Sequence, residues 1–140
     1  TKRMGAKSKS GPNAEILSDA RTSSKQRFST ALVDVMEKGT VNRRCRSLNQ
    51  LIRQRAFFKS EEGKEKRRAA VELLKGHFSP KETPLAVNEA IVGTLTQIAK
   101  EEEVRSFMEK IVNDEEVDEI VKDDAEMGLR IWDAQHNDGR

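Results

Sequence analysis

Long hydrophobic runs are absent from this sequence of 140 residues. No unbroken stretch of apolar side chains exceeds three residues, whereas a helix that crosses a bilayer needs about 20. The amino end, which begins Thr1-Lys2-Arg3-Met4, also lacks the apolar core of a secretory signal. We therefore expect no association with a membrane.

Cysteine and aromatic residues are scarce as well. The single cysteine, Cys45, excludes an internal disulfide and a zinc site built from several cysteines of one chain. The five Phe and one Trp are few for a sheet protein, because strands favour aromatic and β-branched side chains. These shortages favour an all-α protein in a reducing, intracellular compartment, either the cytoplasm or the nucleus.

Charged residues are abundant, and they are distributed unevenly along the chain. They make up 36% of the sequence, and this share, with the length and the mean hydropathy of -0.76, indicates one small domain. Residues 1–76 contain 19 Lys and Arg against 8 Asp and Glu, whereas residues 77–140 contain 7 against 16. Such an asymmetry between halves indicates an interaction with a charged partner.

Hydrophobic spacing predicts a small bundle of five to six amphipathic helices in antiparallel hairpins. These helices are expected within residues 24–132, between a flexible basic arm of residues 1–23 and a flexible tail of residues 133–140. The arm is polar apart from Ile16-Leu17, so it cannot bury enough surface to offset the entropy of ordering. Hydrophobic spacing predicts a first helix from Ser24 and a fifth that includes Val104. Cap residues predict further helix starts near Thr40 or Asn42, at Ser60, at Thr83-Pro84 and at Asn113.

Apolar stripes predict which residues form the core. The first helix buries a stripe that begins at Phe28, and the helix from Pro84 to about Lys100 has the broadest stripe, which places it centrally. The stripe of the second helix comprises Val41, Cys45, Leu48 and Ile52. A break near Asn113 separates the fifth helix from the sixth, and the sixth ends near Trp132.

The side chains needed for catalysis are few. His77 and His136 are the only histidines, and Cys45 lies in an apolar stripe where a thiol is inert. The acidic residues between positions 114 and 119 lack the order and the glycine of a calcium loop. The glycines are scattered singly and form no phosphate-binding loop. We expect no enzyme activity, no metal and no cofactor.

A concentration of basic side chains is the strongest functional signal. Five arginines lie within 13 residues of the second helix, and the planar guanidinium group suits phosphate. Further cations lie on the third helix and in the arm, although neighbouring glutamates would neutralise part of their field. The predicted nucleic-acid-binding residues are Arg43, Arg44, Arg46, Arg53, Arg55, Lys64, Arg67, Arg68, Lys2, Arg3, Lys7 and Lys9.

Phe57 has two interpretations. If the second helix continues through it, the ring is exposed beside arginines and can stack on a base. If the helix ends by Ala56, Phe57 and Phe58 instead close the core of the hairpin. We favour the second interpretation.

Two functions fit these patterns. The first is a non-catalytic module that binds nucleic acid, RNA or a ribonucleoprotein in preference to DNA, through phosphate neutralisation. The second is a protein-interaction or self-assembly module, in which the basic half meets an acidic partner protein or the acidic half of another copy. No base-specific contact is predicted, because no known reader motif is present.

Overall fold

Helices follow one another along almost the whole of the described chain. The structure is a computed structural model and describes residues 11–138. Within this range it contains eight α-helices, one short 3-10 helix and no strand, which confirms the all-α prediction. The elements are α2 (Gly11–Ser18), η1 (Ala20–Thr22), α3 (Lys25–Lys38), α4 (Val41–Arg53), α5 (Arg55–Lys59), α6 (Lys64–His77), α7 (Leu85–Ile98), α8 (Glu101–Val112) and α9 (Glu119–Asp138). None of these helices is both long and apolar enough to span a bilayer.

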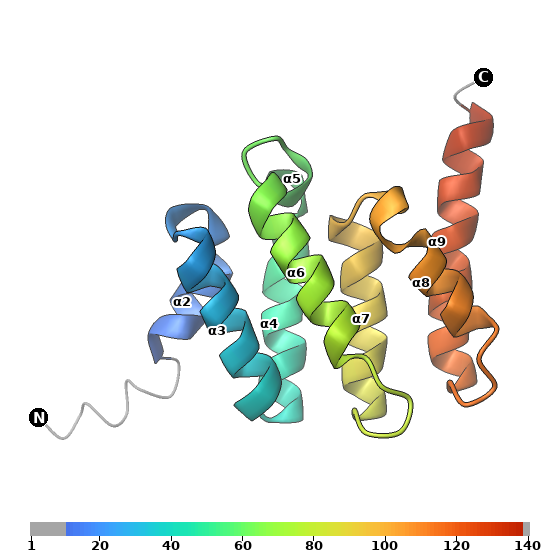
Figure 1. The fold of residues 1–140 in the computed structure, drawn as a ribbon, viewed down its shortest axis with the longest axis horizontal. Coiled ribbons are helices and arrows are strands. Elements are labelled where there is room, and N and C mark those ends of the chain that lie inside the picture. Colours follow the sequence, from blue (N-terminus) through green and yellow to red (C-terminus); the bar gives the residue numbers. More distant parts are fainter. Residues whose placement is uncertain (1–10, 139–140) are drawn as a thin grey trace, which may run out of the picture.

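The helices form two layers (Figure 1). The back layer contains α2, α4, α7 and α9, and each of these helices packs against the next. The front layer contains α3, α6 and α8 in the same order. Successive helices alternate between the layers and run antiparallel, so α4, α7 and α9 all run in the same direction. The predicted antiparallel hairpins are therefore stacked side by side.

Polar side chains close several helix ends, as expected from the sequence. Ser24 accepts a hydrogen bond from the Arg27 N–H at 3.1 Å, and Thr40 accepts one from the Arg43 N–H at 3.1 Å. The start predicted at Asn113 is wrong, because Asn113 follows the last residue of α8. The last helix begins at Glu119, where the Asp118 carboxylate accepts from the Ile120 N–H at 3.0 Å.

Both ends of the described chain are more helical than predicted. Residues 11–22, part of the predicted flexible arm, form α2 and η1 and bury Leu17 and Ala20 completely. Their anchor is Gln54, whose side chain accepts from the Ala20 N–H at 2.7 Å and donates to the Leu17 carbonyl at 2.6 Å. α9 continues to Asp138 through most of the predicted tail. Residues 1–10 of the arm lie outside the described residues.

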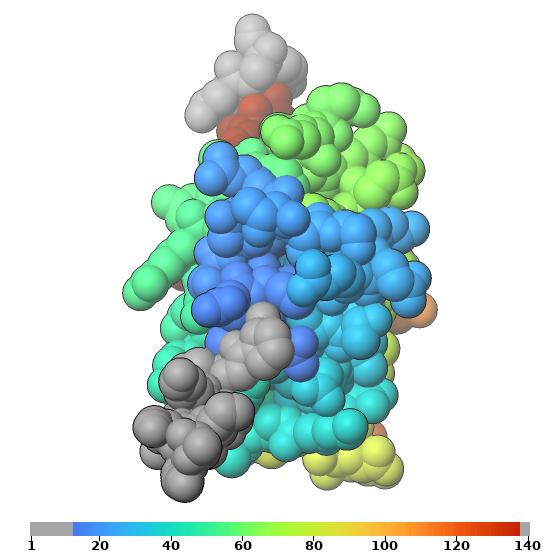
Figure 2. Space-filling view, turned by 90° about the vertical axis from the view of Figure 1, so that its left-hand side faces the viewer, coloured from blue at the N-terminus to red at the C-terminus, as the bar shows by residue number. Residues whose placement is uncertain are grey.

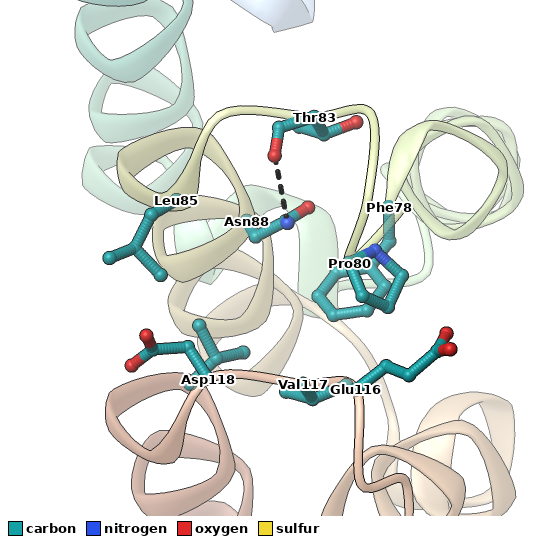
Figure 3. A pocket seen from close by; sticks show the side chains of 9 residues that line it. Phe78, Pro80, Thr83, Leu85, Asn88, Glu116, Val117 and Asp118 are labelled. Atoms are coloured by element: carbon teal, nitrogen blue, oxygen red, sulfur yellow. Dashed lines mark hydrogen bonds between the residues drawn. The ribbon is translucent and has the colours of Figure 1, made fainter.

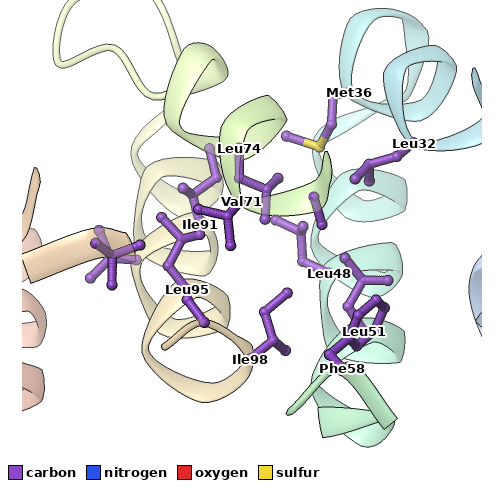
Figure 4. Packing of buried hydrophobic residues seen from close by; sticks show 14 of the residues in the cluster. Leu32, Met36, Leu48, Leu51, Phe58, Val71, Leu74, Ile91, Leu95 and Ile98 are labelled. Carbon is purple, nitrogen blue, oxygen red and sulfur yellow. The ribbon is translucent and has the colours of Figure 1, made fainter. Parts of the chain in front are cut away.

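The hydrophobic core lies between the layers, and Figure 4 shows its packing around α4, α6 and α7. The stripes predicted for α3 and α7 are confirmed, and α7 lies between α4 and α9 as its broad stripe implied. The stripe predicted for α4 is only partly right. Leu48 is buried, but the helix also buries Ser47 and Leu51, while Val41 is exposed.

A short break follows α4. The chain turns at Gln54, and α5 then carries Phe58 into the core against Phe28, with ring centroids 5.8 Å apart. Gly63 lies beside this segment: a Cβ at position 63 would meet the Phe57 carbonyl oxygen at 2.1 Å. Only glycine permits this close approach of backbone to backbone.

Candidate interaction faces

The predicted basic residues of α4 do not share one environment. Arg46 and Arg53 are exposed and lie on the side of α4 opposite Leu48 and Leu51, so they point outward from the back layer. Arg44 is half-buried and donates from Nε to the Gly39 carbonyl at 2.9 Å. Two of the predicted arginines therefore form an outward-facing pair on this helix.

The remaining described residues of the prediction are separated from that pair. Arg43 is half-buried, while Arg55, on α5, donates to the Ile52 carbonyl at 3.1 Å. Lys64 pairs with Glu61 at 3.8 Å, and Arg68 is exposed. Both of these α6 residues belong to the front layer. Figure 2 shows α4 and α6 on opposite sides of the molecule when it is viewed from its amino-terminal end.

Arg67 is not a surface cation at all, and its assignment to a nucleic-acid site is wrong. It is 5% exposed, and it makes three hydrogen bonds of 3.1–3.2 Å to the carboxylate of Glu103 on α8. A further bond of 3.0 Å runs from its guanidinium group to the Phe58 carbonyl. Arg67 therefore links α5, α6 and α8 inside the protein.

The environment of Glu103 fits this structural role. Desolvation raises the pKa of its carboxyl group, but the hydrogen bonds from Arg67 and from the Lys100 N–H outweigh it, and the pKa is lowered overall. The carboxylate therefore stays ionised beside the buried guanidinium group. A buried charge of this kind needs its partner, because an unpaired one is costly.

The described members of the predicted nucleic-acid-binding set therefore do not share one face. They divide between the two layers, and Arg67 is buried in an ion pair. The four arm residues of the prediction, Lys2, Arg3, Lys7 and Lys9, lie outside the described residues.

One hollow adjoins the outward arginine pair. It has a volume of about 450 Å³ and is lined by Ser18, Asp19, Arg21, Arg53, Gln54 and Phe57. Phe57 is half-buried against Phe58, with ring centroids 5.3 Å apart, and the Lys66 ammonium lies 5.6 Å from its ring centre. The interpretation in which the helix ends before Phe57 is thus the better one, and Phe57 is half-buried at the wall of the hollow.

The back layer has a feature that the sequence reading missed. All five exposed large hydrophobic side chains in the described part of the chain lie on α4, α7 and α9, and they are 39–56% exposed. They are Val41, Leu85, Ile120, Met127 and Ile131. The spacing of Ile120, Met127 and Ile131 places them on one side of a helix, a signal that the sequence contains.

The contacts of α9 show where this stripe points. Gly128 approaches α7, where a Cβ at position 128 would lie 3.0 Å from the Thr96 hydroxyl. Asp133 accepts a 2.8 Å hydrogen bond from Arg105 of α8, which lies in the front layer. The apolar stripe is roughly opposite the α8 side of α9. It therefore faces outward from the back layer, as Arg46 and Arg53 do on α4.

The helices at the two edges of this face carry opposite charge. α4 contains four arginines and no carboxylate. α9 contains six carboxylates against one lysine and one arginine. α7, between them, has one charged residue, Glu89. The outer surfaces of α4, α7 and α9 together are called the back face below.

The other candidate sites have structural explanations. Figure 3 shows a hollow of about 200 Å³ between the α6–α7 and α8–α9 connections. Its amide, Asn88, is fully engaged, since it bonds the Ser79 N–H, the Ser79 carbonyl and the Thr83 carbonyl. His136 lies 2.6 Å from Glu101, and burial raises the pKa of the Cys45 thiol. Among the described residues, no group of three or more His, Cys, Asp and Glu side chains could hold a metal ion.

Comparison with other proteins gives no family for this chain. No protein-family model matches the sequence, and neither curated proteins nor solved structures give a match.

Proposed function

We propose that the protein is a non-catalytic interaction module that binds another protein surface through its back face. The observation that carries this proposal is the outward stripe of α9, where three large hydrophobic side chains, Ile120, Met127 and Ile131, are 44–56% exposed. Single exposed apolar residues are common on any protein, whereas their concentration on one face is typical of an interaction surface.

The mixture of apolar and charged side chains on the back face favours a specific partner over nonspecific association. Met127 and Ile131 are each about half exposed, so covering either one contributes on the order of 1 kcal/mol. The cationic α4 and the acidic α9 border this apolar surface. Charges in such positions orient a partner and raise the rate of productive encounter.

Affinity capture with matched variants tests the proposal. The back-face variant Met127→Asp/Ile131→Asp should lose partners that the wild-type protein retains after nuclease treatment, and the front-face variant Arg68→Glu should retain them. Both variants should have near wild-type melting temperatures, because all three side chains are exposed. Identical partner sets for the two variants would contradict the proposal, as would the loss of all partners with nuclease.

Nucleic-acid binding is the second candidate function, and one observation favours it. Arg21 and Arg53 line the same hollow, beside Phe57, at the basic end of the molecule. In this case affinity for RNA should fall steeply with salt, because bound phosphates release counterions. Fluorescence anisotropy should show weaker binding for Arg46→Gln/Arg53→Gln than for Arg68→Gln. Equal RNA affinity of the two variants would remove this candidate.

A further inference from the structure

We infer that the partner of the back face is a second copy of the same chain, in a dimer whose two-fold axis runs parallel to α7. This inference rests on the proposed function and names the occupant of its site. In the dimer the back faces meet, α7 packs near α7, and α4 of each copy lies opposite α9 of the other. Three observations support this dimer: the opposite charges of α4 and α9, the positions of charged side chains along these helices, and the small residues on the outward side of α7.

The charge pattern selects the orientation of the axis. Two copies that meet face to face must be related by an axis lying in the interface. An axis across the helices would place α4 on α4, so that the outward pair Arg46 and Arg53 would face its own copy with no carboxylate of α4 between them. An axis along the helices places the arginines of α4 opposite the carboxylates of α9. Opposite charges then face each other twice, once on each side of the axis.

The positions of the charged side chains along α4 and α9 agree with this arrangement. α4, α7 and α9 begin at the same end of the layer (Figure 1). Arg46 lies five residues after the start of α4, and Asp123 and Asp124 lie four and five residues after the start of α9. At a rise of about 1.5 Å per residue, all three are about 6–8 Å along their helices.

The centre of the face permits close approach. The outward side of α7 carries Ala86, Ala90 and Gly93 near the axis, together with Glu89 and Gln97. A Cβ at position 93 would have no neighbouring atom within 4 Å, so this side of the helix is open. Small residues allow two helices to pack at the short end of the usual range of about 8–10 Å between axes.

The size of the face indicates how strong the dimer is. Three neighbouring helices about 20 Å long and about 9 Å apart present on the order of 600 Å² per copy. Stable complexes commonly bury about 800 Å² per partner. We therefore expect a dissociation constant in the micromolar range and a marked weakening at high salt, because the charged edges stay partly solvated.

Sedimentation equilibrium of the full chain with charge-reversed variants tests the inference. Arg46→Glu/Arg53→Glu and Asp123→Lys/Asp124→Lys should each sediment as monomers under conditions where the wild-type chain dimerises. An equimolar mixture of the two should recover a heterodimer, because both of its α4–α9 contacts then join opposite charges, one with the signs reversed and one as in the wild type. The variant Arg68→Glu changes an exposed cation of the front layer, and it should dimerise like the wild type. Thermal melts establish that each variant is folded, and Asp123→Lys alone replaces the double variant if the latter is not.

The outcomes separate this inference from the proposed function. A wild-type chain that stays monomeric at about 100 μM and low salt overturns the dimer, whereas partner capture that depends on Met127 and Ile131 would still support the back face as a binding site. A dimer that tolerates both charge reversals overturns the inference, because the interface must lie elsewhere. Growth beyond the dimer overturns the two-fold axis, because only an open, head-to-tail contact propagates.

Discussion

Replacing Glu103 by Gln should destabilise the protein by about 3 kcal/mol, because it removes the charge that, among residues 11–138, pairs with the buried Arg67 guanidinium group. The two side chains are 6% and 17% exposed, so water screens their interaction poorly. The Gln side chain keeps an oxygen that can accept from the Lys100 N–H, which Glu103 does at 3.0 Å. Glu103→Gln therefore removes the charge but keeps the hydrogen bond that caps α8.

The loss is large relative to the stability of a protein of this size. Domains of about 140 residues unfold with roughly 5–15 kcal/mol, and a loss of about 3 kcal/mol lowers the melting temperature by about 10 °C. Urea titrations followed by circular dichroism would measure it. Arg68→Met is the matched control, because Arg68 is the next residue, is exposed, and forms no ion pair with the described part of the chain. We expect the control to stay within about 0.5 kcal/mol of wild type.

A double substitution and the pH dependence complete the test. Arg67→Met/Glu103→Gln should cost less than Glu103→Gln alone, because no charge is left without its partner. Because the folded-state pKa of Glu103 is lowered, the stability it contributes is present above the unfolded pKa of about 4.3 and is lost as the pH falls through the folded pKa. The gap between wild type and Glu103→Gln should therefore close on acidification. A cost below about 1 kcal/mol at pH 7 would refute the reasoning, because buried pairs typically cost several times that.

Three further predictions follow from close contacts. In urea titrations Gly63→Ala should lower the free energy of unfolding by about 1–3 kcal/mol, because the new Cβ would meet backbone atoms. Gly76→Ala should raise it by about 0.5–1 kcal/mol, because a Cβ at position 76 has no neighbour within 4 Å. Equal effects of the two substitutions would contradict this. Gln54→Ala should speed hydrogen exchange across α2 and η1, while the exposed Asn49→Ala should not. Because burial raises the pKa of the Cys45 thiol, disulfide reagents should modify it faster in urea than in the native protein at pH 7.5; equal rates would show that the thiol is accessible.

The sequence was sufficient where a helix buries a single face. α3 illustrates this, because each residue of the stripe from Phe28 to Met36 is buried as its spacing predicted. α4 is different, since it contacts α7 on one side and lies against the front layer on another. Its buried surface is therefore broader than one stripe and includes Ser47, which the hydrophobic pattern does not identify. α2 was missed because its anchor, Gln54, is a polar side chain more than 30 residues away.

The candidate site was harder to predict because it, too, depends on contacts between residues that are far apart in the chain. A local pattern cannot distinguish Arg67 from Arg68, because what separates them is a carboxylate 36 residues further along the chain. The helical spacing also gave no indication that α4 and α6 belong to different layers. The hydrophobic stripe of α9, in contrast, is visible in the spacing of Ile120, Met127 and Ile131, but the acidic residues around it make the segment resemble a solvent-exposed helix face.

The contact between Arg67 and Glu103 also bears on how the molecule comes apart. In a stack of hairpins most contacts join immediate neighbours, so the ends can open while the middle stays folded. This ion pair joins α6 to α8 directly, and α7 lies between them in the chain. It therefore ties the α6–α7 hairpin to the α8–α9 hairpin, and without it the α8–α9 hairpin should open more readily than the middle of the stack.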